Sequence, residues 1–283
     1  VLTIKSPDLT VKDYTLRRET IKVASLKGYK HLPGGGWDYF VDPNQKIAYM
    51  RLASFSRTTG DELDKAVDEL KAKGARAIIL DLRYNPGGLL TAATDVSDKF
   101  LHSGVIVSTR ADRDTPNPPT VATAHADGGE TDLPLVVLVN QYSASASEIV
   151  SGALKDQHRA TIVGERTFGK GSVQMMFGLT NNDALLKLTT SHYYLPSGKC
   201  IHREENSTEW GVDPDVTVEM TPEQMRAAID ARQDMDVLRD AKVVVKAGPA
   251  TTQPAKKDLL ASDPQLSAGL LLLRLKLSNG AAM

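Results

Sequence analysis

The sequence has little of what marks several large classes of protein. Its 283 residues include one cysteine, Cys200, which excludes an intramolecular disulfide framework. The apolar runs are short, and Leu270–Leu273 near the C-terminus falls far below the ~20 residues that a membrane-spanning helix needs. An excess of one charge is also missing, because 34 Lys and Arg face 35 Asp and Glu. This balance argues against a dedicated nucleic-acid-binding protein, which normally carries a basic excess.

What is present is the composition of an ordinary globular protein. Hydrophobic residues make up 41% and charged residues 24% of the chain, which excludes a collagen-like or disordered chain. The length suits one large domain, or one and a half ordinary ones, with a sizeable core. The chain begins at Val1 without a methionine or a signal-like segment, so we expect a trimmed start.

The middle of the chain alternates between short apolar runs and amphipathic segments. The run 77–82 is almost wholly apolar, which is typical of a strand buried in a parallel sheet. The expected strands are 47–52, 77–82, 105–107, 135–139 and 160–163, and the expected helices are 61–73, 89–100 and 148–155. This order indicates βαβ units with helices beside a mixed or parallel sheet, and therefore an α/β (mixed α+β) fold.

The two ends of the chain differ from this middle part. Residues 1–28 form short extended segments, and a helix with leucines on one face is expected to begin at Asp263-Pro264. Two further strands are expected at 172–179 and 185–191, joined by a turn at 181–183, and a linker of low apolar content at 246–257. The expected organisation is an N-terminal segment (1–28), a core (29–220) and a helical tail (221–283).

The segment 164–171 nearly matches a phosphate-binding loop. Two glycines and Lys170 are in place, and a strand precedes them. However, Gly171 stands where the Ser or Thr that holds magnesium belongs, and a strand rather than a helix is expected next. No helix N-terminus is then available for a phosphate, so we expect no nucleotide site here.

A second segment, 140–148, lies between an apolar strand and a helix. Its small residues allow close backbone approach, and the helix N-terminus offers N–H groups beside a hydroxyl, as an oxyanion hole requires. It is not a Gly-x-Ser-x-Gly elbow, because Ala flanks the central serine. The alternative is a helix cap, since Ser145 followed three residues later by Glu148 forms a capping box. Alone, the segment favours the cap.

A third segment, 85–88, reads Asn-Pro-Gly-Gly directly after a buried strand. Glycines at this place allow backbone N–H groups to point at a ligand, although a plain turn explains them equally well.

A serine nucleophile also needs a base. The six histidines all lie in polar, turn-like surroundings that are typical of surface positions, namely His31, His102, His125, His158, His192 and His202. Lys170, between glycines and close to Phe168, could turn inward, although a surface position is far commoner for a lysine. As a base it must be neutral, which requires burial to lower its pKa from ~10.4.

Together these segments resemble the carboxyl-terminal processing peptidases, the tail-specific proteases of peptidase family S41. The resemblance covers about residues 15–220. It is carried by blocks in the family's order, at 80–88, 143–148 with 152–156, 167–174, 193–198 and 211–215. It implies a serine protease with a Ser/Lys dyad on a fold similar to those of the Clp protease and crotonase.

The resemblance also implies roles for single residues. Ser145 corresponds to the nucleophile, Lys170 to the dyad lysine 25 positions further on, and Gln174 to the glutamine that orients this lysine. Two other serines, Ser143 and Ser147, flank Ser145, and only the spacing to Lys170 selects the middle one.

The oxyanion hole would be formed by the backbone N–H of Ala146 and by one N–H of the pair Gly87 and Gly88. Neutral Lys170 would take the proton of Ser145 and deliver it to the leaving amine.

The resemblance further implies an endopeptidase that cleaves protein substrates near their C-termini, bound as extended strands at a sheet edge. It implies no cofactor, no metal and no nucleic-acid partner. It also implies a place in the cell envelope (periplasmic or extracytoplasmic), with homo-oligomers or peripheral membrane association among the expected partners.

The N-terminal segment departs from the family pattern. Members usually carry a PDZ domain ahead of the catalytic core, and here only 10–11 and 16–21 look like its closing strands. Either the sequence starts inside such a domain or the protein lacks it, which affects substrate capture and gating. Two other interpretations stay open: a catalytically silent member that binds peptides or scaffolds a complex, and a crotonase-type acyl-CoA enzyme, which would have no use for a Ser145–Lys170 pair.

Overall fold

The computed structural model describes residues 1–6, 8–19, 23–32, 35–111, 119–126, 132–179, 184–236 and 259–279. The turn expected at 181–183 and the linker expected at 246–257 lie outside these ranges.

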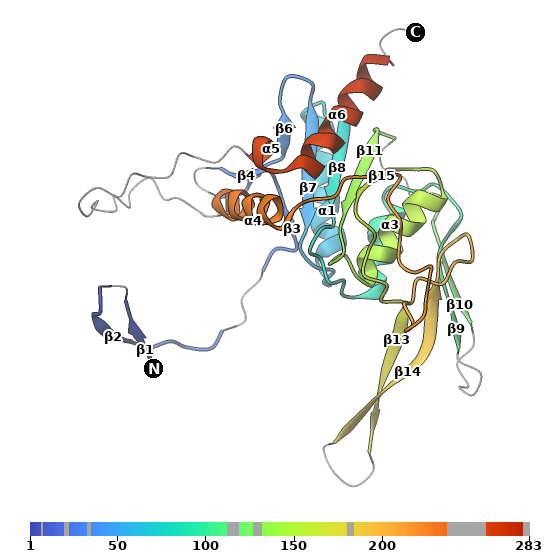
Figure 1. Cartoon of the computed structure of the whole chain (residues 1–283), viewed down its shortest axis with the longest axis horizontal. Helices are drawn as coiled ribbons and strands as arrows, with labels where there is room; N and C mark the ends of the chain where they lie inside the picture. The colour runs from blue at the N-terminus through green and yellow to red at the C-terminus, as the bar shows by residue number, and fades with distance from the viewer. Residues whose placement is uncertain are drawn as a thin grey trace.

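A seven-stranded sheet forms the centre of the molecule (Figure 1). Its strands are β3 (Leu26–Lys27), β6 (Phe40–Asp42), β7 (Ile47–Leu52), β8 (Ala77–Asp81), β11 (Leu135–Val139), β12 (Thr161–Gly164) and β15 (Val216–Thr217). The order is β15-β12-β11-β8-β7-β3, and β6 also pairs with β7. From β15 to β7 every pairing is parallel, whereas β3 and β6 run antiparallel to β7. The strands expected at 47–52, 77–82, 135–139 and 160–163 and their mixed sheet are therefore confirmed, whereas the strand expected at 105–107 belongs to a different sheet.

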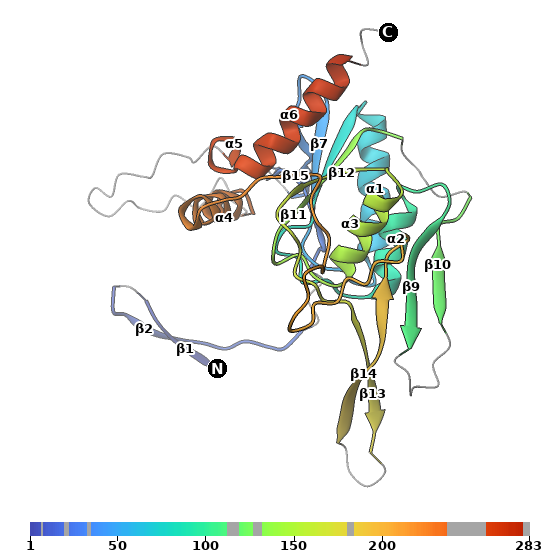
Figure 2. The same cartoon turned by 45° about the vertical axis from the view of Figure 1, so that its right-hand side comes forward.

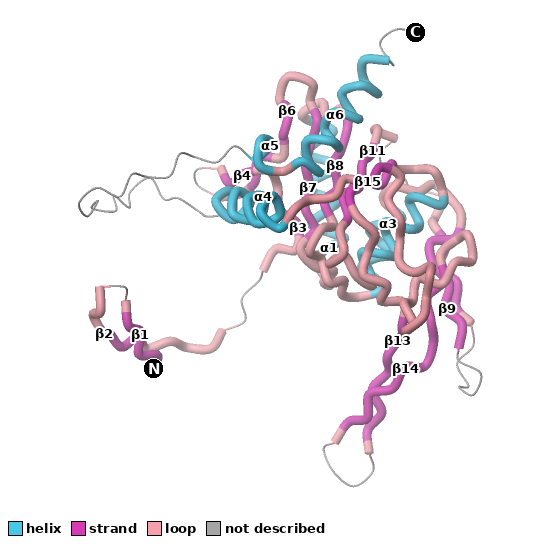
Figure 3. Tube along the Cα trace, viewed as in Figure 1, coloured by secondary structure: helices cyan, strands magenta, loops and turns pink. Residues whose placement is uncertain are grey.

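Helices cover both faces of this sheet, because successive strand residues point to opposite sides. On one face, α1 (Thr59–Ala72), α2 (Leu90–Asp98) and α3 (Ala146–Asp156) belong to a core that includes Met50 and Leu80. On the other face, α6 (Pro264–Asn279) packs with α5 (Leu259–Ser262) and α4 (Pro222–Asp236) over residues such as Tyr49 and Ile79. The tube of Figure 3 shows this layering, in which the helical tail closes the second face of the sheet.

A second sheet of four antiparallel strands lies at one end of the molecule (Figure 2). It contains β9 (Val105–Ala111), β10 (Thr120–Thr123), β13 (Ser172–Gly178) and β14 (Leu185–Tyr194), in the order β10-β9-β14-β13. The outer parts of β13 and β14 project away from the body as a two-stranded ladder.

The N-terminal segment is separate from both sheets in the figures. β1 (Leu2–Lys5) pairs antiparallel with β2 (Val11–Tyr14), and every residue of both strands is exposed. β3 lies before the expected boundary at residue 28 and joins the central sheet, and β4 (Lys30–His31) pairs with β5 (Trp37–Asp38). That residues 1–28 close a PDZ-like domain stays a prediction. No helix in the described ranges has the length and apolar composition to cross a bilayer.

The packing of α6 gives a direct test of the second core. Leu273 is 1% exposed in this core, whereas Leu271 on the same helix is 56% exposed. We expect Leu273→Ala to lower the free energy of unfolding by about 2–5 kcal/mol, because it leaves a cavity between α6 and the sheet. Leu271→Ala is the matched control and should change the free energy by no more than about 0.5 kcal/mol. Urea unfolding followed by circular dichroism measures both, and equal losses would contradict the described packing.

Candidate active site

Three neighbouring parallel strands deliver the three segments that the sequence singled out. The loop 82–89 follows β8, the turn 140–145 follows β11, and the segment 165–171 follows β12. Because β8, β11 and β12 are adjacent and parallel, their carboxyl ends meet at one edge of the sheet. Open α/β sheets place their ligand sites at this edge.

Ser145 lies at the tightest point of the turn between β11 and α3. Its backbone has φ 57° and ψ −113°, a combination that residues with a side chain rarely adopt. Such strained residues persist only where the surroundings hold them, and they cluster at functional sites. The helix α3 begins at Ala146, so its positive dipole end lies beside the Ser145 hydroxyl.

The structure distinguishes the three serines of this turn. Ser143 is fully buried, and its hydroxyl donates to Leu82 O at 2.8 Å. Ser147 is also fully buried, and its hydroxyl donates to Asn85 O at 2.9 Å. Ser145 alone of the three is partly exposed. A substrate can therefore reach only the middle hydroxyl, which the sequence selected by spacing alone.

The loop 85–88 is fastened to the serine turn by Asn85, which is fully buried. Its backbone oxygen accepts a bond from Ala144 N at 3.0 Å, and its side-chain amide donates to Leu52 O at 2.9 Å. The same side chain accepts a bond from Gly87 N at 2.9 Å. These bonds fix the glycine pair against the turn that carries Ser145.

Gly87 touches both Ser145 and Ala146. A Cβ added to Gly87 would lie 2.8 Å from Ser145 Cβ and 3.0 Å from Ala146 N, and φ is 98° at this position, so only glycine fits. Gly88 is equally constrained, since its added Cβ would meet Phe55 O at 2.0 Å. The N–H of Gly87 is already donated to Asn85, which leaves that of Gly88 as the candidate donor of this pair beside Ala146 N–H.

Glu148 joins the two halves of the expected dyad. Its carboxylate accepts four hydrogen bonds, from Ser145 N (2.8 Å), Lys170 N (2.8 Å), Gly169 N (2.7 Å) and Thr167 Oγ1 (2.6 Å). The bonds from Ser145 and Lys170 end on the same oxygen, Oε2, so both backbones converge on one atom. The side chain is fully buried.

Burial raises the pKa of the Glu148 carboxyl above its ordinary value, although the four donated bonds act in the opposite direction. The bonds to Gly169 and Lys170 also occupy the N–H groups that a phosphate would need, which agrees with the expectation of no nucleotide site.

Lys170 and Gln174 have exposed side chains in this structure. The backbone of Lys170 is held by Glu148, but its amine makes no hydrogen bond or ion pair with any described residue. A lysine that acts as a base needs burial of its amine, and the described residues alone do not supply that burial here. Gln174 lies on β13 opposite Thr189, just after a register shift, and no bond in the described ranges joins it to Lys170.

A buried ionic cluster holds the end of β8, where the loop 82–89 begins. Arg83 donates to Asp81 Oδ2 and to Asp263 Oδ2, each at 2.7 Å, and Tyr49 Oη donates to Asp81 Oδ2 at 2.7 Å. Asp263 lies just before α6 and also accepts a bond from Leu266 N at 3.0 Å. The tail helix is thus tied to the strand end that leads into the glycine pair. Burial acts to raise the pKa of Asp81, but the charge of Arg83 and the donated bonds lower it to about 2.

Sequence reasoning missed two parts of this arrangement. The sequence indicates Glu148 only as a helix cap, yet three of its four hydrogen bonds come from residues 167–170, which no local pattern reveals. Asp263 lies 180 residues from Arg83 in the chain, so their pairing had no sequence signal. In the described ranges no group of three His, Cys, Asp or Glu side chains could hold a metal ion.

Replacing Glu148 tests whether its carboxylate holds Ser145 and Lys170 in position. In Glu148→Gln an NH₂ group replaces one of the two acceptor oxygens, so it can face the N–H groups of Ser145 and Lys170. Each buried N–H group left without an acceptor lowers the free energy of unfolding by about 1–3 kcal/mol. If the chain has the peptidase activity that the resemblance implies, we expect its rate to fall roughly 10–100-fold. Glu62→Gln is the control, because Glu62 also accepts two backbone N–H bonds, from Ser25 and Leu26, away from the site. Equal activity losses in the two variants would contradict a special role for Glu148.

The pKa of Asp81 predicts how stability depends on pH. A carboxyl whose pKa falls from 3.8 to about 2 on folding stabilises the folded state above pH 3.8 and loses this effect as the pH falls toward 2. We expect Asp81→Asn to cost about 2–3 kcal/mol of unfolding free energy at pH 7 and clearly less at pH 3. Urea titrations at both pH values measure the difference. A cost that is the same or larger at pH 3 would contradict the assignment.

Comparison with known proteins covers most of the chain. The sequence model of peptidase family S41 matches residues 46–218. A "Carboxy-terminal-processing protease" of Bartonella bacilliformis is 36% identical over 288 residues, which is 95% of this chain and 58% of the relative. A "Carboxyl-terminal-processing protease" of Synechocystis is 44% identical over 177 residues, which is 62% of this chain and 39% of the relative.

Among solved structures, the photosystem II D1 C-terminal processing protease superimposes with a TM-score of 0.57 at 31% identity. The match covers 75% of this chain and 53% of that protein, so the chain spans about half the length of the relatives it matches. The expected mixed α/β fold is confirmed by this likeness. On this evidence the chain belongs to peptidase family S41, the family of the carboxyl-terminal processing proteases.

Proposed function

We propose that this chain is the catalytic core of a serine endopeptidase that cleaves polypeptides near their C-termini. Ser145 is the nucleophile and Lys170 the general base. The backbone N–H groups of Ala146 and Gly88 stabilise the oxyanion, and Gly87 provides the close contact between them. Membership of peptidase family S41 and the names of the relatives support this activity.

The observation that carries the proposal is the backbone of Ser145. It combines a strained backbone of positive φ, a helix N-terminus, partial exposure and a glycine contact in one residue. A capping serine needs none of the strain, because N-caps normally have extended backbones. A nucleophile needs this strained backbone, because the sharp turn exposes its hydroxyl to a substrate.

The reaction then proceeds in two halves. Neutral Lys170 accepts the hydroxyl proton as Ser145 Oγ bonds to the peptide carbonyl carbon, and the negative oxygen is held by Ala146 and Gly88. The C–N bond breaks as Lys170 returns the proton to the leaving amine. Water then attacks the acyl-enzyme, gives a proton to Lys170, and releases the new C-terminus while the proton returns to Ser145.

The amine of Lys170 must be desolvated to act as a base in this way. Its amine is exposed, and an amine is neutral near pH 7 only when it is desolvated or close to another cation. We propose that the bound substrate supplies this cover and that Gln174 then orients the amine. Closure by substrate would also restrict activity to the occupied site.

Two further proposals follow from the family resemblance alone. One is a place of action in the cell envelope, and the other is a homo-oligomer or a peripheral association with the membrane. The competing functions are a silent peptide-binding member and an acyl-CoA enzyme. The position of Glu148 favours the peptidase over both, because neither function needs Ser145 and Lys170 anchored to one carboxylate.

Cleavage of casein tests the proposal. We expect the wild-type chain to cleave it, Ser145→Ala to abolish cleavage, and Lys170→Ala to reduce the rate roughly 10²–10⁴-fold, the usual contribution of a general base. Lys71→Ala, an exposed lysine on α1, is the control and should leave the rate unchanged. Cleavage that survives Lys170→Ala would remove Lys170 as the base. Absence of cleavage by the wild type, with retained peptide binding, would favour the silent member.

A further inference from the structure

Two tyrosine rings stack beside the proposed active site. Tyr84 precedes Gly87 by three residues in the loop after β8, and Tyr142 precedes Ser145 by three residues in the turn after β11. The ring centroids are 5.4 Å apart and the ring planes are inclined by 17°, which is an aromatic stack. The two backbones also share an anchor, because both tyrosine N–H groups donate to Asn140 Oδ1, each at 3.1 Å. The stack therefore joins the loop of the glycine pair to the serine turn.

Tyr84 has a strained backbone at this place. Its φ is 61°, in the left-handed region that bulky residues rarely adopt. Such a conformation persists only where the surroundings hold it, and it is common where the residue has a function. Glycine or asparagine would fill a plain turn at lower cost, so the strain indicates that the ring itself is needed here.

The tail helix α4 supplies a third member of this group. The guanidinium carbon of Arg232 lies 4.8 Å from the centroid of the Tyr84 ring, which is the distance of a cation–π contact. Burial raises the pKa of the Tyr84 phenol above its ordinary value, although the charges of Arg83 and Arg232 act in the opposite direction. The ring is therefore neutral near pH 7, and its face attracts the cation.

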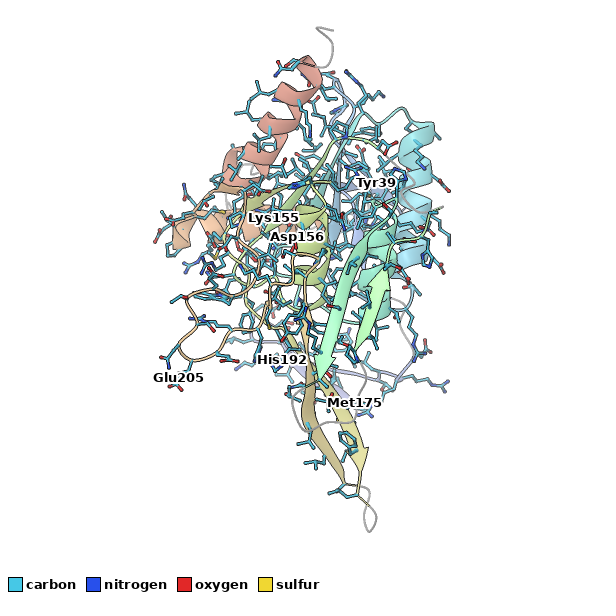
Figure 4. All side chains as sticks on the ribbon, turned by 90° about the vertical axis from the view of Figure 1, so that its right-hand side faces the viewer. Tyr39, Lys155, Asp156, Met175, His192 and Glu205 are labelled. Carbon is cyan, nitrogen blue, oxygen red and sulfur yellow. The ribbon has the colours of Figure 1, made fainter. Side chains whose placement is uncertain are left out.

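The helix α4 is itself fastened to the central sheet. Asp236 lies one turn after Arg232, and its carboxylate pairs with Lys27 Nζ of β3 at 2.9 Å. The same carboxylate pairs with Arg51 Nη2 of β7 at 2.5 Å. In Figure 4, α4 (orange) and α1 (pale blue) lie on opposite sides of the molecule. Arg232 therefore connects the layer of the tail to the edge of the sheet that carries the active site.

We propose that Tyr84, Tyr142 and Arg232 are positioning residues, and that α4 acts through them to hold the serine turn and the glycine pair at a fixed separation. This inference rests on the proposed peptidase function and extends it to the tail, since α4 begins at Pro222, beyond the residues 46–218 that the family model matches. In this role none of the three side chains touches the substrate. They keep the nucleophile and the oxyanion donors in place, where a shift of about 1 Å can cost roughly 100-fold in rate.

The alternative is that the rings form a platform for a substrate side chain, since Tyr142 is 50% exposed. The contacts favour positioning, because Tyr142 is stacked on the Tyr84 ring and Arg232 lies over the same ring. The two roles also differ in kinetics. A platform contributes to substrate binding and therefore to KM, whereas positioning contributes to kcat.

Steady-state cleavage of fluorescein-labelled casein separates these roles. Tyr142→Leu should lower kcat roughly 10-fold and change KM less than about twofold, because the substrate still binds while the serine turn is misplaced. Tyr142→Phe keeps the ring and should recover most of this loss. Tyr14→Leu is the matched control, since Tyr14 is 43% exposed on the separate pair of β1 and β2. A raised KM with an unchanged kcat in Tyr142→Leu would overturn the proposal.

A double-mutant cycle tests the connection to the tail. Arg232→Gln should lower kcat roughly 3–10-fold in the wild-type chain and have no further effect in the Tyr84→Leu background, because the ring that it contacts is gone. Arg226→Gln, which replaces an exposed arginine of the same helix, is the control and should leave kcat unchanged. If Arg232→Gln had the same effect in both backgrounds, Arg232 would not act through Tyr84.

Hydrogen exchange followed by mass spectrometry measures the same connection without catalysis. Arg232→Gln should speed exchange of the backbone N–H groups in 140–147 roughly 10-fold, and those of β8 should exchange as slowly as in the wild type. Unchanged exchange in 140–147, or faster exchange throughout the chain, would overturn the proposal. This readout also decides if Tyr142→Leu fails to fold. A wild-type chain that neither cleaves casein nor reacts with a fluorophosphonate would refute the peptidase function, and the exchange rates would still test the role of Arg232.

Discussion

The site depends on one buried carboxylate. Glu148 accepts hydrogen bonds from the backbone N–H groups of Ser145 and Lys170 on one oxygen. Its other oxygen accepts bonds from the Gly169 N–H group and the Thr167 hydroxyl. Glu148 joins the strained turn after β11 to the glycine-rich segment after β12, beside one direct backbone bond from Phe168 N to Ser143 O at 3.0 Å. A neutral side chain cannot replace it fully, because four donors converge and only a carboxylate offers acceptors alone. Burial raises the pKa of this carboxyl, and the four bonds offset part of that effect.

Around this anchor, the central sheet holds the three segments of the site in place. Adjacent parallel strands bring the glycine pair, the serine and the lysine segment to one edge, and Asn85 ties the first two together. The cluster of Asp81, Arg83 and Asp263 extends this support to the tail helix. The side chain of Lys170 is left exposed, two residues before β13 begins. We infer that the site holds its nucleophile, Ser145, in a fixed position, and that the bound substrate desolvates its base, Lys170.

Much of this was predictable from the sequence. Apolar runs at 47–52 and 135–139 predicted β7 and β11 to the residue, and the helical spacing over 61–73 predicted α1 within two residues. The sequence also indicates the serine turn and the glycine pair, although only the structure shows their contact. The exposure of Lys170 was not predictable, because burial of a flexible side chain depends on what packs over it. The ion pair between Arg83 and Asp263 was not predictable either, because a pairing of residues far apart in the chain produces no local sequence pattern.

The central claim is that Ser145, and neither of its neighbours, is the nucleophile. Ser143 and Ser147 have buried hydroxyls bonded to main-chain oxygens, whereas Ser145 is accessible at a helix N-terminus. The most direct test is peptide mapping by mass spectrometry after reaction of the wild-type chain with a fluorophosphonate. The account predicts a single adduct on Ser145. An adduct on Ser143 or Ser147, or no adduct from a chain that cleaves casein, would contradict it.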